Sequence, residues 1–315
     1  MSDFESFLRD RGFLPRHAVV PDGRWHRCPT ESHPRKRNGS YKLATDGMVG
    51  WAQDFATDSE PQTWRPDRVS PTPHFDAAAL RRANAEARAK QVRATLAARE
   101  YHRECDPLKG SHPYLDSHGL DVSGCYGLRV DRDGWLVVPM FRDRNLMSVQ
   151  RIAPDGVKRF WSGAPASGSS YVIERAHASI TVLCEGLATG LAIFNAAPLV
   201  RCVVAFNSGN LSKVAVPYAG LLTIAADNDW ETEGRIGSNP GLLAALEAAS
   251  VHGGGIAVPR DIVGTDWCDW RAEKTVERMG KRLPRQTPAD VRRAVDAEIA
   301  DAMARAASFR SLQHG

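Results

Sequence analysis

The sequence lacks the features that mark secreted, disulfide-stapled or membrane proteins. Its 315 residues include only 6 cysteines, and no two of them form a Cys-x-x-Cys pair. We therefore expect reduced thiols rather than a disulfide framework. No apolar run reaches the length of a membrane span, and the charged start of the chain predicts no signal peptide. These absences together favour a cytoplasmic protein without a membrane partner.

Two other absences narrow the functional class. The sequence contains neither an internal repeat nor the P-loop pattern Gly-x-x-x-x-Gly-Lys-Ser/Thr, so we expect no fused helicase motor. Its 43% hydrophobic and 25% charged residues are ordinary for a globular protein. The length allows two or three domains. The net charge of +4 is compatible with a nucleic-acid partner but does not by itself indicate one.

Acidic residues follow two short apolar runs. Residues 180–184 lead into Glu185, and residues 221–226 lead into Asp227 and Asp229. Apolar runs of this length, followed by polar turns and Ala-rich helical segments, predict parallel strands of an α/β sheet. Ligands of such sheets gather at the carboxyl ends of the strands. We therefore expect the three acidic side chains to lie at one edge of the sheet.

The spacing of these acids points to a cation. Asp227 and Asp229 are two residues apart, so in an extended segment both side chains point to the same side. Carboxylates gathered in this way repel one another unless a cation lies between them. Their hard oxygen atoms suit Mg²⁺ or Mn²⁺. The alternative is that these acids are solvated loop residues, and the spacing alone leaves it open.

The order of motifs resembles the Toprim domain. Glu-Gly at 185–186, Asp-x-Asp at 227–229 and Gly-Thr-Asp-x-x-Asp at 264–269 occur in the order of that family. The segments at 208–211 and 264–267 resemble more narrowly the primases of phages and conjugative plasmids, which are related to the core of bacterial DnaG-type primases. Cys268 departs from the family, which more often has Asn there. The resemblance implies a Rossmann-like α/β domain with a mainly parallel sheet and flanking helices.

The same resemblance implies a domain order. We expect a small β-rich unit at 1–70, a linker and long helix at 71–106, a small basic α+β subdomain at 107–175, the Toprim domain at 176–283 and a helical tail at 284–315. A linker at 60–73 and a helix over 76–104 follow from composition. Paired strands are predicted around residues 142–145. Inside the Toprim domain we expect strands at 180–185, 201–207, 221–227 and 255–259, and helices at 188–197, 240–251 and 269–281.

The amino-terminal unit leaves two interpretations open. Cys28-Pro29 resembles the start of the zinc ribbon of bacterial primases, but the second cysteine pair is missing. Because structural zinc needs four ligands, zinc is not expected. Several aromatic residues alternate with Arg and Lys in this unit; they are Trp25, Tyr41, Trp51 and Trp64. They predict either a platform for single-stranded nucleic acid or the core of a small sheet.

The resemblance implies a primase that synthesises short RNA primers. Glu185, Asp227 and Asp229 would be the metal ligands, with Glu185 as a further ligand or as the general base. Three basic residues would contact nucleotide or template phosphates; they are Arg151, Lys158 and Arg159. The implied partners are single-stranded DNA, nucleoside triphosphates and a replicative helicase. Asp266 and Asp269 would support the site from outside or steady the fold.

Two other functions fit the same residues. The carboxylate cluster suits a metal-dependent Toprim nuclease equally well, because the same ligands can activate water. A non-catalytic adaptor that binds single-stranded DNA is the third candidate, and the three intact acids argue against it.

Overall fold

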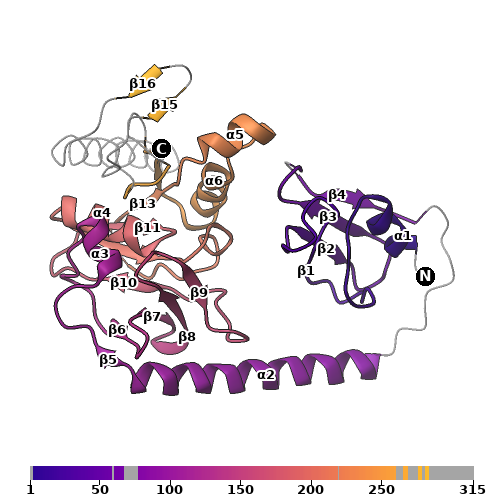
Figure 1. The fold of residues 1–315 in the computed structure, drawn as a ribbon, viewed down its shortest axis with the longest axis horizontal. Helices are drawn as coiled ribbons and strands as arrows, with labels where there is room; N and C mark the ends of the chain where they lie inside the picture. Colours follow the sequence, from indigo (N-terminus) through magenta and orange to yellow (C-terminus); the bar gives the residue numbers. More distant parts are fainter. Residues whose placement is uncertain are drawn as a thin grey trace, which may run out of the picture. The chain divides into compact units, whose positions relative to one another are not determined.

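The computed structural model describes residues 3–58, 60–66, 77–218, 220–259, 265–268, 276–278 and 281–283. The chain forms two compact units, one of residues 1–87 with 234–238 and the other of residues 88–233 with 239–315. Figure 1 shows the order of the elements in each unit. The architecture is mixed α/β with several sheets, as the sequence predicts at that level. No helix in the described part of the chain is both long and apolar enough to cross a bilayer.

The first unit packs one helix against a four-stranded antiparallel sheet. Its elements, with the strands in the order β1-β2-β3-β4, are α1 (Asp3–Asp10), β1 (His26–Cys28), β2 (Gly39–Leu43), β3 (Gly50–Asp54) and β4 (Gln62–Trp64). Phe4 of α1 is fully buried, and its ring lies 5.2 Å from that of Trp64. A Cβ atom at Gly50 would lie 2.3 Å from the Phe4 ring, so a glycine at this strand position permits the close packing.

The aromatic residues of this unit divide between core and surface. Tyr41 is buried in the core cluster and Trp64 packs against it, whereas Trp25 is 48% exposed. Strand β4 lies inside the segment 60–73 for which we expected a linker, so that prediction is wrong for residues 62–64. Pairing with β3 and the contact of Trp64 with Phe4 override the polar and proline-rich composition of this stretch.

A long helix, α2 (Ala77–Glu104), follows and confirms the helix predicted over 76–104. After it comes an antiparallel sheet in the order β5-β6-β7-β8-β9. Its strands are β5 (Asp106–Pro107), β6 (Arg129–Val130), β7 (Leu136–Arg142), β8 (Asn145–Ile152) and β9 (Lys158–Phe160), with helix α3 (Pro113–His118) between the first two. Asp143 and Arg144 both have positive φ values, 48° and 64°. Such a two-residue turn matches the strand twist, and the predicted hairpin is confirmed.

A second five-stranded sheet, in the order β10-β12-β11-β13-β14, is parallel except for its edge strand β10. Its strands are β10 (Tyr171–Ile173), β11 (Ile180–Cys184), β12 (Val200–Val204), β13 (Leu221–Ala225) and β14 (Gly255–Ala257). Four helical segments connect them: α4 (Leu187–Ala196), the 3₁₀ turn η1 (Ser208–Asn210), α5 (Trp230–Ile236) and α6 (Pro240–His252). The strands and helices predicted up to residue 259 agree with these bounds to within three residues.

Both faces of the parallel sheet are covered. Val182 and Cys184 of β11 point into one core cluster with α4, while Leu183 points into another with α6. This burial on both sides explains why the strands read as continuous apolar runs. The α4 side also contains Leu136 and Ile152 from the antiparallel sheet, so one core joins the two sheets.

The end of the described chain differs from expectation. A strand pair, β15 (Val276–Arg278) and β16 (Lys281–Leu283), occupies part of the segment predicted as a helix over 269–281. That prediction is wrong for the described residues, because the two strands pair with each other and pairing overrides local propensity. The other residues of that segment, Asp269 among them, and the tail at 284–315 lie outside the described residues.

Candidate functional site

The candidate site lies at the carboxyl ends of β11 and β13. These strands are parallel neighbours, with Cys184 opposite Ala225. Glu185 directly follows the first strand, and Asp227 and Asp229 follow the second. Burial, together with the charges of Asp229 and Asp266, raises the pKa of Glu185 to about 7, while a hydrogen bond from the Ser208 backbone acts in the opposite direction. The acids are therefore near enough to influence one another's charge.

Asp227 is the acid of this group whose charged form is most disfavoured by its surroundings. Burial raises its pKa well above the ordinary value, followed in size by the charges of Glu185, Asp266 and Asp229, and Lys158 acts in the opposite direction. Its Oδ1 atom is buried and has no hydrogen-bond partner among the described residues. A buried carboxylate oxygen without a donor is costly. A cation bound to this oxygen would therefore offset the cost of its burial.

Asp229 is held by a helix start instead. Its Oδ2 accepts a hydrogen bond of 2.9 Å from the backbone amide of Gly241, in the first turn of α6. The partial positive charge of a helix N-terminus stabilises a carboxylate there. A Cβ atom at Gly241 would lie 2.3 Å from the carbonyl oxygen of Asp227. The glycine thus lets α6 approach the backbone that carries both acids.

Two buried asparagines fix this loop, and the sequence reasoning missed both. Asn228 donates from Nδ2 to the carbonyl of Pro259 at 3.0 Å, and its Oδ1 accepts from Asn239 Nδ2 at 3.0 Å. Asn239 Oδ1 accepts from the amides of Asp229 (3.2 Å) and Leu242 (3.1 Å), so it caps α6. The signal that could have found it is an Asn directly before Pro240, a pairing typical of a helix start.

The segment around Asp266 is anchored to the end of β13. Trp267 is 1% exposed, and its Nε1 donates to the carbonyl of Ala226 at 3.1 Å. Asp266 Oδ1 accepts from the amide of Cys268 at 2.6 Å. Asp266 is also among the charges that raise the pKa values of Glu185 and Asp227. Its place beside the acids is thus described, whereas Asp269 lies outside the described residues.

The turn after β12 fixes the amide that contacts Glu185. Phe206 has a φ of 71°, a backbone conformation that bulky residues rarely adopt. Such a conformation persists only where the surrounding contacts enforce it. Asn210, 2% exposed, accepts from the amide of Gly168 at 2.6 Å and donates to the carbonyls of Ser169 (2.9 Å) and Ala205 (2.7 Å). The 208–211 motif thereby ties the loop before β10 to the turn that carries Ser208.

The three basic candidates lie on different faces of the antiparallel sheet. Lys158 and Arg159 are consecutive in β9, so their side chains point to opposite faces. Lys158 belongs to the side that influences Asp227. Arg151 lies directly opposite Arg159 in the β8–β9 pairing, and therefore on the other face.

On that other face Arg151 is surrounded by rings. Its guanidinium carbon lies 5.3 Å from the ring centroid of Trp135 and 5.8 Å from those of Tyr101 and Trp161. The Tyr101 hydroxyl donates to Asp131 at 2.5 Å. These contacts give Arg151 a packing role whatever else it binds.

Metal ligands do not converge fully in this arrangement. In the described part of the chain, no group of three or more His, Cys, Asp or Glu side chains is placed to hold one ion. Mg²⁺, however, is commonly held by one or two carboxylates, with waters and substrate phosphates completing its coordination. Asp227 and Asp229 provide that number of oxygen ligands, and the buried Oδ1 of Asp227 fits the same requirement.

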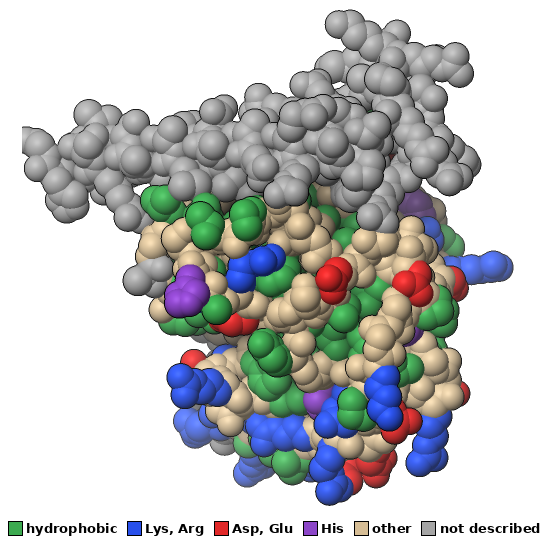
Figure 2. Space-filling model, turned by 90° about the vertical axis from the view of Figure 1, so that its left-hand side faces the viewer, with side chains coloured by type: hydrophobic (Ala, Val, Ile, Leu, Met, Phe, Trp, Pro, Cys, Tyr) green, Lys and Arg blue, Asp and Glu red, His purple; other side chains and the backbone are tan. Residues whose placement is uncertain are grey.

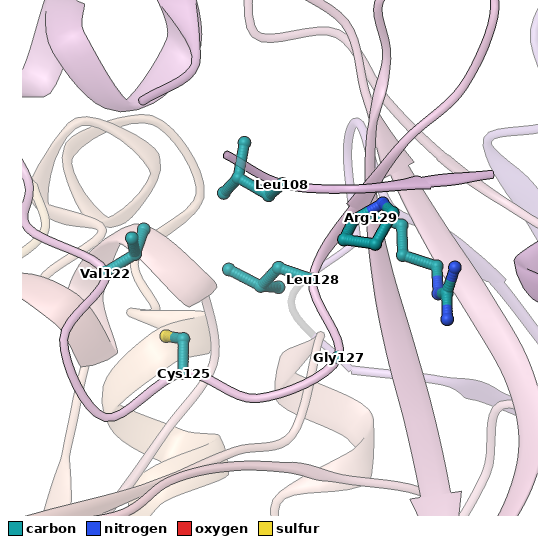
Figure 3. Close-up of a pocket in the computed structure, with 7 residues that line it drawn as sticks. Leu108, Val122, Cys125, Gly127, Leu128 and Arg129 are labelled. Atoms are coloured by element: carbon teal, nitrogen blue, oxygen red, sulfur yellow. The ribbon is translucent and has the colours of Figure 1, made fainter. Parts of the chain in front are cut away.

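A separate hollow of about 220 Å³ carries no comparable chemistry (Figure 3). Apolar side chains converge on it, while Arg129 points away and donates to the carbonyl of Cys105 at 2.7 Å. Burial raises the pKa of its Cys125 to about 11, so that thiol stays protonated at neutral pH.

Figure 2 shows one face of the second unit, with Lys and Arg side chains gathered in its lower half, at the level of the antiparallel sheet.

Comparison with known proteins finds a curated relative but no matching protein-family model. The chain is 30% identical to DNA primase TraC of Escherichia coli over 309 aligned residues, which take in 90% of this chain. It spans only 28% of the length of that relative.

The comparison with solved structures gives two matches at low identity. One is the DnaG primase catalytic domain bound to ssDNA, at 13% identity, with 70% of this chain and 83% of that chain covered and a TM-score of 0.37. The other is the primase fragment of the bacteriophage T7 primase-helicase protein, at 13% identity, with 81% and 92% covered and a TM-score of 0.35. Likenesses at these scores support no further conclusion about this chain.

Proposed function

We propose, from the similarity to DNA primase TraC, that this chain is a primase catalytic region with a Toprim-type sheet. Its reaction would join ribonucleotides into short primers on single-stranded DNA. The observation that supports this most is the group of acids at the ends of two neighbouring parallel strands, with one carboxylate oxygen buried and unpaired. Hydrolysis by a nuclease is the second candidate, because the same ligands suit both.

The metal in this proposal is Mg²⁺ or Mn²⁺, held by Asp227 and Asp229. The unpaired Oδ1 of Asp227 and the hard oxygen chemistry of both ligands fit such an ion. When bound, the ion would supply positive charge to the incoming triphosphate and to the leaving pyrophosphate. The backbone amide of Gly241 and the two asparagines keep the ligands in place before any ion arrives.

Glu185 is the proposed general base. With a pKa of about 7 it is partly ionised at neutral pH, so it can accept the proton of an attacking 3′-hydroxyl and release it again. The Ser208 backbone contact orients this carboxyl group, and Asn210 in turn fixes the turn that carries Ser208. The alternative role as a further metal ligand uses the same position.

The basic residues divide the phosphate contacts. Lys158, whose charge acts on Asp227, would contact the phosphates of the nucleoside triphosphate. Arg159 is exposed on the other face, where Arg151 is its partner on the neighbouring strand. It would contact the template backbone. Single-stranded DNA and nucleoside triphosphates are the proposed substrates. A replicative helicase is the proposed protein partner.

A primer-synthesis assay tests the proposal. The protein is mixed with single-stranded DNA, labelled ribonucleotides and Mg²⁺ or Mn²⁺, beside the double variant Asp227→Asn, Asp229→Asn. Glu247→Gln, which removes an exposed carboxylate of the same unit, is the matched control. Short labelled products from the wild type and the control, but not from the double variant, would support the primase. Degradation of the DNA that the double variant loses would support the nuclease. DNA binding without either reaction would support the adaptor.

A further inference from the structure

The first unit contains a basic pocket that lies outside the candidate catalytic site. It has a volume of about 460 Å³ and lies beside β1, the edge strand of the four-stranded sheet. The side chains that give it its character are Arg16, His17, His26, Arg27, Arg37 and Tyr41. Tyr41 is 6% exposed and forms part of the floor, while the three arginines are exposed around it. The pocket is therefore concave, with cations at its rim.

The positive charge of this pocket comes from three arginines. No ion pair joins Arg16, Arg27 or Arg37 to a carboxylate in the part of the chain that the structure describes. Arg37 Nη2 donates to the carbonyl of Arg27 at 2.9 Å, which holds these two residues together. Burial and the neighbouring charge of Arg37 both lower the pKa of Arg27. A bound anion would relieve this repulsion between like charges.

Two carboxylates lie near the pocket: Glu5, whose Oε1 accepts from the amide of Val19 at 3.0 Å, and Asp22. Asp22 Oδ1 contacts His26 Nε2 at 3.0 Å and also accepts from the amide of Arg24 at 2.9 Å. Its contact is thus with the imidazole and a backbone amide. The three guanidinium groups keep their charge available for a ligand.

Exposed rings beside the pocket identify the kind of anion. The guanidinium carbon of Arg27 lies 4.5 Å from the centroid of the Phe55 ring, and Phe55 is 47% exposed. Trp25, directly before His26 in the chain, is 48% exposed. Cations that contact phosphates next to rings that stack on bases are the combination by which proteins bind single strands. A free inorganic anion would use the arginines alone.

We propose that this pocket binds a backbone phosphate of a single-stranded nucleic acid, with a neighbouring base stacked on Phe55. The unit would then hold the strand through arginines and a ring, without a zinc ion. The inference rests on the proposed function only for the identity of the strand as template DNA. The pocket shares no residue with the acidic site, so the two proposals can be tested separately.

The test measures binding of the full chain to a labelled strand. The probe is fluorescein-labelled oligodeoxythymidine of about 12 nucleotides, within the range of known single-strand sites. Fluorescence anisotropy is followed in EDTA without nucleotides, so the result does not depend on catalysis. Arg16→Gln, Arg37→Gln is compared with Arg35→Gln, Lys36→Gln, which removes the same charge from exposed positions outside the pocket lining. Thermal unfolding of each variant checks that it is folded.

The pocket variant is expected to bind the strand at least about tenfold more weakly than the control variant at moderate salt. It should also reduce the magnitude of the slope of log K against log salt by about 0.7, since the pocket is proposed to hold one phosphate and each phosphate contact on a single strand contributes about 0.7. Phe55→Ala should weaken binding without changing this slope, because a stacked ring displaces no counterions. Arg16→Lys, Arg37→Lys should retain most of the affinity, and it provides the comparison if the glutamine variant does not fold.

Three results would overturn the inference. Equal weakening in the pocket and control variants would show that only overall charge matters. Unchanged binding in the pocket variant would place the strand elsewhere. Displacement of the strand from the wild type by micromolar dTTP or by micromolar inorganic phosphate, lost in the pocket variant, would assign the pocket to a free nucleotide or a free phosphate ion instead.

Discussion

The raised pKa of Glu185 predicts how the stability of the folded protein changes with pH. Its pKa rises from 4.5 to about 7 in the folded protein, mainly because of burial. A folded-state pKa above the unfolded value means that the folded protein binds this proton more tightly. The stabilisation is present below about pH 4.5 and is lost as the pH rises through 7. At about 1.36 kcal/mol per pH unit, the full loss is about 3 kcal/mol.

Glu185→Gln should therefore flatten the pH dependence of stability without metal. Scanning calorimetry in EDTA at pH 5 and pH 8 measures it. About 2.5 kcal/mol of the loss falls between these pH values, so the variant should lose roughly 5–10 °C less in Tm than the wild type, at about 2–4 °C per kcal/mol. Part of the slope remains in the variant because the pKa of Asp227 is raised as well. Glu247→Gln is the control. Identical pH slopes in Glu185→Gln and the wild type would refute the raised pKa of Glu185.

Three other substitutions test how the site is held. Gly241→Ala should destabilise the second unit by about 2 kcal/mol and abolish primer synthesis, because its Cβ would lie 2.3 Å from the Asp227 carbonyl oxygen; calorimetry and the primer assay together measure this. Asn239→Ala should lower the free energy of unfolding, measured in urea, by about 2–3 kcal/mol, because α6 loses its cap and Asn228 loses its partner. Unchanged stability would contradict this hydrogen-bond network. Arg151→Ala should lower stability by about 1–2 kcal/mol through its ring contacts, yet leave Mg²⁺ affinity by calorimetric titration unchanged.

The core of the second unit could be predicted from the sequence because its strands carry one dominant signal. Residues 180–184 and 221–225 are apolar on both faces, which happens only where helices cover both sides of a sheet. Once the strands are parallel neighbours, the residues after them must meet at one edge. The places of Glu185 and Asp227 therefore follow from burial and chain direction alone.

The wrong predictions concern short strands whose formation depends on pairing with another strand. Strand β4 is polar at two of its three positions and forms because β3 offers a free edge and Trp64 reaches the core. The strands β15 and β16 are likewise stabilised by pairing with each other. Such contacts join residues that no local pattern connects, so composition predicted a linker in one case and a helix in the other.

The sequence alone could not assign the basic residues to the two faces of the antiparallel sheet, because the assignment depends on the register of β8 and β9. In sequence Arg151, Lys158 and Arg159 look equivalent, since each is a basic residue of a segment expected to form paired strands. The structure places Arg151 opposite Arg159, and the alternation of β9 then sends Lys158 to the other face. On that face, the charge of Lys158 acts on Asp227. A phosphate that approaches the acids would therefore meet the charge of Lys158 first, while the ring contacts of Arg151 hold its guanidinium on the far side of the sheet.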